Sequence, residues 1–315
     1  MPGCPPDRIM IDRILILGTG LLGTSTGLSL REAGFNGTIT GWDKDPSQAE
    51  TACSLHAIHA VAETVETALA EAKVAQLILI ATPVYAILDW MEQLAPVLGE
   101  QQLVTDVGST KSLITAAAAR LFNQPGRAAF LPGHPMAGKE HSGAAHADGA
   151  LFKGAVWIFT PAASDQVSND QVSNDRAFAD PIPADLPTAA LAGEWRAWVE
   201  AFGCRILDVE ATRHDELVAW VSHLPQFLST ALTALLESRI GDAPELTAIG
   251  GRALREMTRL GSSPYSMWRD IALTNTEAIA DSIHALEQRL AHLRENLRTP
   301  ELRDEFEVAN RFRKG

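Results

Sequence analysis

RILILGTGLLG, residues 13–23, joins a short apolar run to three closely spaced glycines. The apolar run predicts a buried strand, and the small residues from Leu21 to Ala33 predict a helix directly after it. Glycine at positions 18, 20 and 23 permits a tight turn and lets the backbone approach a ligand closely. Strand, glycine turn and helix in this order are typical of a pyrophosphate site at a helix N-terminus.

The alternation of apolar strands and helices continues through the first two thirds of the chain. Strands are expected at residues 38–43, 77–82 and 103–107, with a helix at 84–98. This alternation predicts a doubly wound parallel sheet with helices on both faces, which is a Rossmann-type α/β fold. Two further strand-like runs, 155–160 and 205–209, flank a helical stretch at 193–202, and we expect them to extend the same sheet.

The pattern changes twice after residue 160. Residues 163–190 are rich in Ser, Asp, Asn, Ala and Pro, and DQVSN occurs there twice, which predicts a mobile surface insertion. After Thr212 no strand pattern remains, and residues 215–239, 244–260 and 266–297 have helical periodicity. We therefore expect a dinucleotide-binding domain at 1–211 and an all-helical domain at 212–315. Apolar residues on more than one helix face favour burial of the second domain against another subunit.

Composition excludes several classes of protein. The 315 residues include 26 Lys and Arg against 39 Asp and Glu, a formal charge of −13, and no basic run suited to nucleic acid. Three widely separated cysteines provide neither a disulfide framework nor a metal-binding pair, which favours a cytoplasmic protein. No apolar stretch is long enough to cross a membrane, and the N-terminus lacks the apolar core of a signal peptide.

An acidic residue strengthens the glycine motif. Asp43 lies 20 residues after Gly23, the spacing of a carboxylate that binds the ribose hydroxyls of a dinucleotide. Such a carboxylate repels a 2′-phosphate, so NAD is favoured over NADP, although Lys44 beside it weakens the distinction. The alternative is a glycine turn that serves helix packing alone. The predicted cofactor-binding residues are Gly18, Gly20, Leu21, Leu22, Gly23, Asp43, Thr82, Pro83 and Ser109.

Two segments beyond the glycine motif carry candidate catalytic groups. They are TDVGSTK, residues 105–111, at a strand end, and GHPMAGKEHSG, residues 133–143. Removal of a hydride from a carbinol carbon requires an acceptor for the hydroxyl proton, and imidazole accepts protons near neutral pH. His134 is therefore the predicted proton acceptor of a dehydrogenase. The alternative is a turn histidine held between Gly133 and Pro135.

Taken together, the motifs resemble those of one enzyme family. GTGLLG, DVGSTK, HPMAGKEHSG, SHLP (222–225) and TRLGSSPYSMWRDI (258–271) are similar to segments of the prephenate dehydrogenases, over about residues 13–297. The resemblance implies a homodimer formed through the helical domain. It also implies NAD-dependent oxidative decarboxylation of prephenate to 4-hydroxyphenylpyruvate, CO2 and NADH in tyrosine biosynthesis. Arogenate, or both compounds as in cyclohexadienyl dehydrogenases, is an alternative substrate.

The resemblance also implies residue roles. His134 takes the proton of the ring hydroxyl, and Ser109 orients both His134 and that hydroxyl. No metal is required. The implied substrate-binding residues are Arg259, His223, Arg255, Lys139, Glu140 and Trp268. Arg255 and Arg259 lie four apart on a predicted helix, where they can hold carboxylates, although a solvated face paired with Glu256 remains an alternative for them. A third hypothesis, a non-catalytic NAD-sensing protein, is disfavoured because it has no use for a proton acceptor.

Overall fold

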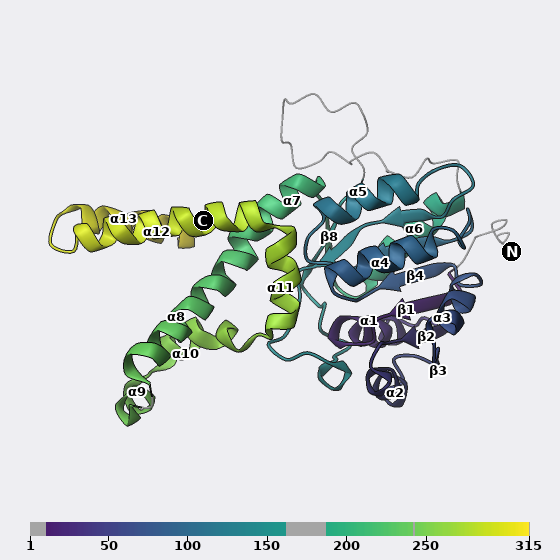
Figure 1. The fold of residues 1–315 in the computed structure, drawn as a ribbon, viewed down its shortest axis with the longest axis horizontal. Helices are drawn as coiled ribbons and strands as arrows, with labels where there is room; N and C mark the ends of the chain where they lie inside the picture. The colour runs from purple at the N-terminus through teal and green to yellow at the C-terminus, as the bar shows by residue number, and fades with distance from the viewer. Residues whose placement is uncertain (1–10, 162–186, 242, 315) are drawn as a thin grey trace, which may run out of the picture. The chain divides into compact units, whose positions relative to one another are not determined.

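The computed structural model describes residues 11–161, 187–241 and 243–314 (Figure 1). They form two compact units. The first holds the chain up to Asp215 together with Ser263–Thr274, and the second holds Glu216–Ser262 and the chain from Asn275 onward. Most of the predicted insertion at 163–190 lies outside the described residues, and from Pro187 the chain is already helical.

Six parallel strands form the central sheet of the first unit. The strands are β1 (Arg13–Leu17), β2 (Thr38–Trp42), β3 (Ala60–Val61), β4 (Leu77–Ile80), β5 (Leu103–Asp106) and β6 (Ala129–Leu131). Their spatial order is β3-β2-β1-β4-β5-β6, so the winding reverses between β1 and β4. Ligands of such sheets bind outside the carboxyl ends of the strands at this reversal. The predicted doubly wound parallel sheet is therefore confirmed.

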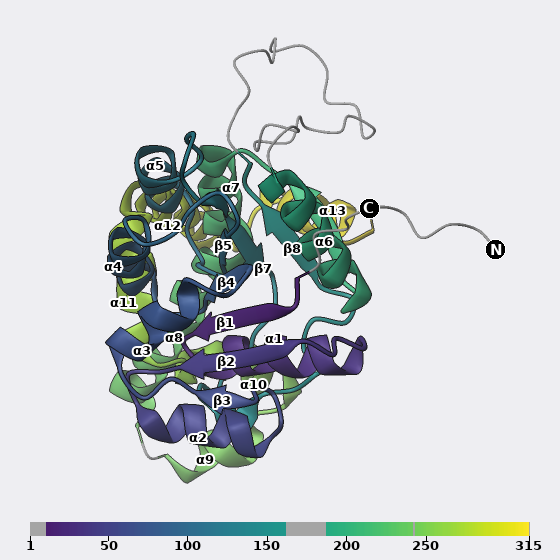
Figure 2. The same ribbon diagram turned by 90° about the vertical axis from the view of Figure 1, so that its right-hand side faces the viewer.

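Helices cover both faces of this sheet, and alternate side chains of the strands face two separate cores. The connecting helices are α1 (Leu21–Glu32), α2 (Pro46–Ser54), α3 (Val65–Ala72), α4 (Val84–Leu94), α5 (Ser112–Leu121) and α6 (Pro187–Ala201). In β1, Ile14 and Ile16 pack with Leu30 of α1, whereas Leu15 and Leu17 pack with α3, α4 and α5. Figure 2 shows α4 and α5 on one side of the strands and α6 on the other. An unbroken apolar run is what a strand covered on both faces requires.

Three further strands form a separate small sheet. They are β7 (Gly133–Pro135), β8 (Val156–Phe159) and β9 (Arg205–Asp208), with β7 antiparallel and β9 parallel to β8. The expectation that β8 and β9 extend the central sheet is wrong. Pro132, which has no N–H, separates β6 from β7, and the central ladder ends there. Apolar runs predicted the strands, but such runs do not specify which strands pair.

Helices follow from Ala211 onward, as expected for the C-terminal region. They are α7 (Ala211–Val218), a π-helical segment (Ala219–His223), α8 (Leu224–Ile240), α9 (Pro244–Ile249), α10 (Arg252–Thr258), a 3-10 turn (Arg259–Ser262), α11 (Tyr265–Thr274), α12 (Thr276–Glu295) and α13 (Glu301–Lys314). The single helices predicted at 244–260 and 266–297 are wrong. The first is interrupted at the helix-breaking pair Gly250 and Gly251, and the second at Asn275, which becomes the N-cap of α12. None of the described helices is long and apolar enough to span a membrane.

Candidate active site

The glycine turn after β1 has the close contacts that only glycine allows. Gly18 has a φ of 95°, and a Cβ there would lie 2.5 Å from the carbonyl oxygen of Ala81. A Cβ on Gly23 would lie 1.9 Å from the carbonyl oxygen of Gly18, so the first turn of α1 packs directly on the loop. Gly20 is the N-cap of α1, and a Cβ there would meet nothing within 4 Å. The helix therefore begins beside open space.

Polar groups at this turn fit a dinucleotide. No side chain caps α1 at Gly20, so the N–H groups of the first turn are available to an anion. The hydroxyl oxygens of Thr19 and Thr82 are buried and have no hydrogen-bond partner among the described residues. A buried hydroxyl without a partner is unfavourable by about 1–3 kcal/mol, and a ribose or pyrophosphate would supply one. These two hydroxyls lie just after β1 and β4, the strands between which the winding reverses.

Asp43 follows β2 and is bound to the glycine turn. Its Oδ2 accepts a hydrogen bond from the N–H of Thr19 at 2.8 Å, and its Oδ1 accepts one from the N–H of Asp45 at 3.0 Å. Burial raises the pKa of Asp43, although both N–H groups oppose the shift. The carboxylate thus lies beside the turn, where ribose binding would require it. Of the two predicted leucines, Leu22 packs against the core behind α1 and Leu21 is half-buried.

His134 lies on strand β7, not in a turn, and is the first member of a buried chain of three side chains. Its Nδ1 is 2.8 Å from Nε2 of His214, and Nδ1 of His214 is 2.8 Å from Oδ1 of Asp215. The exposed fractions of these residues are 8%, 1% and 4%. The two residues beyond His134 were missed at the sequence level, where only the adjacent pair HD in RHDE, residues 213–216, could have indicated them.

Asp106, the last residue of β5, joins the strand of His134 to the loop of Ser109. Its Oδ1 accepts a hydrogen bond from the N–H of Gly133 at 3.1 Å, and its Oδ2 accepts one from Nζ of Lys111. The side chains of Asp106 and Lys111 are completely buried. Ser109 is half-buried in the loop between them. Ser109 therefore follows the carboxyl end of β5, and the hydrogen bond to Gly133 holds the strand of His134 beside that end.

Burial and hydrogen bonding set the charge states of the buried groups. Burial lowers the pKa of His214 against the opposing effect of Asp215, and the nearby ammonium of Lys111 lowers it further. Burial alone would raise the pKa of Asp215, but hydrogen bonds from His214, Ser112 and Lys111 outweigh it and lower the pKa. Burial also lowers the pKa of Lys111, opposed by Asp106. The arrangement favours a neutral His214 next to an ionised Asp215.

This charge distribution predicts a pH-dependent stability. The folded state holds His214 neutral, so unfolding takes up a proton below the ordinary histidine pKa of about 6.5, and the free energy of unfolding falls on acidification by at most about 1.4 kcal/mol per pH unit. Denaturant titrations at pH 7 and pH 5 measure the loss. We expect His214→Gln to reduce the loss and the exposed-site control His284→Gln to leave it unchanged. Equal losses in wild type and His214→Gln would contradict the assignment.

Three predicted substrate-binding residues lie in the second unit, on different elements. Arg255 is on α10, whereas Arg259 begins the 3-10 turn, so the expectation that both lie on one α-helix is wrong; both are exposed. Gln226 of α8 donates from Nε2 to the carbonyl oxygen of Leu260 at 2.7 Å, which ties this turn to α8.

His223 ends the π-helical segment, two residues before Pro225. It is buried, with an exposed fraction of 1%. Its Nδ1 lies 3.3 Å from the amide nitrogen of Asn275, the N-cap of α12. Because the amide nitrogen can only donate, Nδ1 of His223 is the acceptor of this hydrogen bond.

The remaining predicted substrate-binding residues lie in the first unit. Nζ of Lys139 is 3.0 Å from the carbonyl oxygen of His146 and 3.3 Å from Oδ2 of Asp148, so this ammonium pairs within its own loop. Glu140, the next residue, is half-buried. Trp268 lies half-buried on α11, which contacts α4 in the first unit.

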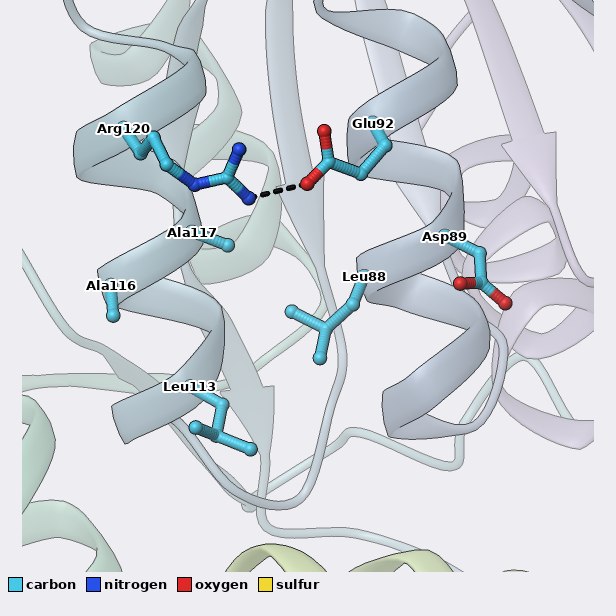
Figure 3. A pocket seen from close by; sticks show the side chains of 7 residues that line it. All are labelled: Leu88, Asp89, Glu92, Leu113, Ala116, Ala117 and Arg120. Atoms are coloured by element: carbon cyan, nitrogen blue, oxygen red, sulfur yellow. Dashed lines mark hydrogen bonds and ion pairs between the residues drawn. The ribbon is translucent and has the colours of Figure 1, made fainter.

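A hollow of about 390 Å³ lies elsewhere in the first unit, between α4 and α5 (Figure 3). Leu88 and Leu113 form part of its lining, and an ion pair between Arg120 and Glu92 crosses it. It contains none of the predicted site residues. Within the described residues, no three His, Cys, Asp or Glu side chains come together as a metal site.

Comparison with known proteins identifies the family. The model of the prephenate dehydrogenase nucleotide-binding domain matches residues 26–175, and the model of the prephenate dehydrogenase dimerization domain matches residues 210–310. The prephenate dehydrogenase of Bacillus subtilis is 29% identical over 273 residues, which are 86% of this chain and 66% of that protein. This chain thus spans slightly less than two thirds of that relative.

Solved structures agree with these matches. The prephenate dehydrogenase of Aquifex aeolicus, in complex with hydroxyphenyl propionate and NAD+, has a TM-score of 0.75 at 28% identity and covers 97% of this chain and 96% of its own. The arogenate dehydrogenase of Synechocystis has a TM-score of 0.70 at 27% identity and covers 96% of this chain and 99% of its own. The chain, with its parallel nucleotide-binding sheet and its helical C-terminal region, belongs to the prephenate dehydrogenase family.

Proposed function

We propose that this protein catalyses the NAD-dependent oxidative decarboxylation of prephenate to 4-hydroxyphenylpyruvate and CO2. One observation carries the proposal: a buried histidine, His134, is held at the carboxyl end of β5 through the hydrogen bond between Gly133 and Asp106. The glycine turn and Thr82 also lie at the carboxyl ends of parallel strands of this sheet, β1 and β4. A cofactor site and a proton acceptor on one sheet edge suit a dehydrogenase.

The chemistry requires few groups from the protein. When bound, NAD would accept the hydride from the ring carbinol carbon. His134 accepts the proton of the ring hydroxyl as the hydride leaves, and Ser109 orients that hydroxyl. Loss of the carboxylate as CO2 then gives an aromatic phenolate, which takes the proton back from His134 to form the phenol of the product, so alignment and one base are sufficient. Asp43 favours NAD over NADP, because its carboxylate would repel a 2′-phosphate.

The remaining assignments belong to the same proposal. Arg259 binds a substrate carboxylate, and Arg255, His223, Lys139, Glu140 and Trp268 contribute to substrate binding. The match of residues 210–310 to a dimerization domain supports a homodimer formed through the helical region. We propose domains at 1–211 and 212–315, and the cytoplasmic location stays a prediction. Similarity to the Synechocystis arogenate dehydrogenase favours arogenate as the second candidate substrate.

NADH absorbance tests the proposal directly. Purified protein is supplied with NAD or NADP, and with prephenate or arogenate. We expect the highest kcat/KM with NAD and prephenate. A higher value with arogenate would establish the second candidate. Absence of NADH from both compounds would contradict an enzymatic function and leave the NAD-sensing alternative.

Arg259→Ala is expected to raise the KM for prephenate by about 10- to 100-fold with little change in kcat. A hydrogen bond to a charged group contributes about 1.5–3 kcal/mol, and this one is present in both ground and transition states. Steady-state kinetics measure the effect. Arg252→Ala is the matched control, because Arg252 lies in the same segment but pairs with Glu256 at 2.6 Å. A large fall in kcat at unchanged KM would overturn the role assigned to Arg259.

A further inference from the structure

The buried hydrogen-bonded series His134–His214–Asp215 has a defined order of donors and acceptors, because backbone N–H groups bind the carboxylate at its Asp215 end. Oδ1 of Asp215 accepts a hydrogen bond from the N–H of Lys111 at 2.7 Å, and Oδ2 accepts one from the N–H of Ser112 at 2.9 Å. Backbone N–H groups can only donate, so both carboxylate oxygens act as acceptors. The ionised carboxylate also accepts from Nδ1 of His214 at 2.8 Å. His214 therefore carries its proton on Nδ1.

The tautomer of His214 then determines that of His134. A neutral imidazole protonated on Nδ1 has its lone pair on Nε2, and this atom lies 2.8 Å from Nδ1 of His134. Only Nδ1 of His134 can provide the hydrogen for that contact. His134 consequently carries its own proton on Nδ1 and its lone pair on Nε2.

From this geometry we propose that His214 and Asp215 are positioning residues, which hold His134 in the tautomer that accepts a proton at Nε2. The inference rests on the proposed function only for the identity of the proton donor, the substrate hydroxyl. On transfer, that hydroxyl proton binds Nε2 of His134 and the proton on Nδ1 stays in place. The resulting imidazolium donates to His214, whose other nitrogen donates to the carboxylate of Asp215, so the new positive charge is stabilised without a second transfer.

The surrounding charges support this arrangement. The ionisable groups that act on His214 are Asp215, Lys111 and Asp106, all of the first unit, together with the imidazole of His134. Protonation of His214 would place a hydrogen on its Nε2 and reverse the contact with His134. Burial and the ammonium of Lys111 both oppose that protonation.

Asp215→Asn tests the proposal, because it keeps the shape of the side chain but removes the negative charge at the end of the hydrogen-bonded series. Only the oxygen of the amide can accept, so the three donors around this side chain, the N–H groups of Lys111 and Ser112 and Nδ1 of His214, can no longer all be satisfied. The negative charge that holds the proton of His214 on Nδ1 is also lost. We expect kcat for prephenate to fall about 10- to 100-fold with KM little changed, the range seen when a partner that orients a reacting group is lost. Asp208→Asn is the control, since Asp208 pairs with Arg196 in the same unit.

Nitrogen-15 NMR of the histidine rings measures which ring nitrogen of His134 and of His214 carries the proton, independently of activity. His→Gln variants assign the nine histidines. We expect Nδ1–H on both His134 and His214 in wild type, and a smaller Nδ1–H population on both in Asp215→Asn. An Nε2–H tautomer of His134 in wild type would refute the proposal. A fall in kcat of Asp215→Asn with the tautomers of both histidines unchanged would also refute it. Correct tautomers without NADH from either substrate would refute the proposed function and leave the positioning role intact.

A second pair of variants covers the case in which Asp215→Asn does not fold. His214→Gln keeps an oxygen that can accept from Nδ1 of His134, whereas His214→Leu removes the acceptor. We expect the glutamine variant to retain at least ten times the kcat of the leucine variant. Equal losses in two folded variants would show that His214 acts only as packing.

Discussion

His134→Asn is expected to lower kcat for prephenate by about 10² to 10⁴-fold, the contribution typical of a positioned general base. The asparagine amide can still hydrogen-bond to His214 but has no lone pair basic enough to take a hydroxyl proton. The KM for prephenate and the affinity for NAD should change little, because proton acceptance stabilises the transition state rather than the bound substrate. Steady-state NADH formation and quenching of tryptophan fluorescence by NAD measure the two effects.

His56→Asn is the matched control for this variant. His56 lies exposed in a turn with a φ of 60°, a conformation that asparagine tolerates well. Its kcat should equal that of wild type. A His134→Asn enzyme that keeps its kcat and loses only substrate affinity would show that His134 binds the hydroxyl without accepting its proton.

Four of the six strands of the central sheet, β1, β2, β4 and β5, could be predicted because their determinants are local in sequence, whereas β3 and β6, of two and three residues, are too short to give such a signal. β1 and β4 are short apolar runs, and the glycines that shape the turn lie within six residues of one another. Leu15, Ile16 and Leu17 are fully buried, as an unbroken run between two helical layers requires. The side chain of Asp43 also lies where the spacing from Gly23 indicated, next to the N–H of Thr19.

Features that depend on distant partners could not be predicted in this way. His134 and His214 are 80 residues apart in sequence, and neither residue has a local pattern that identifies the other. The same limit explains the error over β8 and β9, whose apolar runs predicted strands but not their pairing with β7. By contrast, the break between α9 and α10 was locally encoded, since two consecutive glycines at 250 and 251 disfavour a continuous helix.

Lys111→Met is expected to lower the free energy of unfolding by about 3–5 kcal/mol, because it leaves the carboxylate of Asp106 buried without its cation. Both side chains have an exposed fraction of 0%, so water cannot replace the lost ammonium. Denaturant unfolding measures the effect. Lys73→Met, at an exposed lysine of the same unit, should change stability by less than about 0.5 kcal/mol.

A double variant distinguishes the lost ion pair from lost packing. Combining Lys111→Met with Asp106→Asn removes the unpaired charge, and the amide oxygen can still accept from one of the N–H groups of Gly108 and Gly133, which bind different oxygens of Asp106. We expect the double variant to recover part of the stability lost in the single variant. A double variant no more stable than the single one would show that the unpaired charge is not the main cause of the loss. If stability is recovered, Asp106 acts mainly as the acceptor for the N–H groups of Gly108 and Gly133. These hydrogen bonds place the neighbouring residues Ser109 and His134.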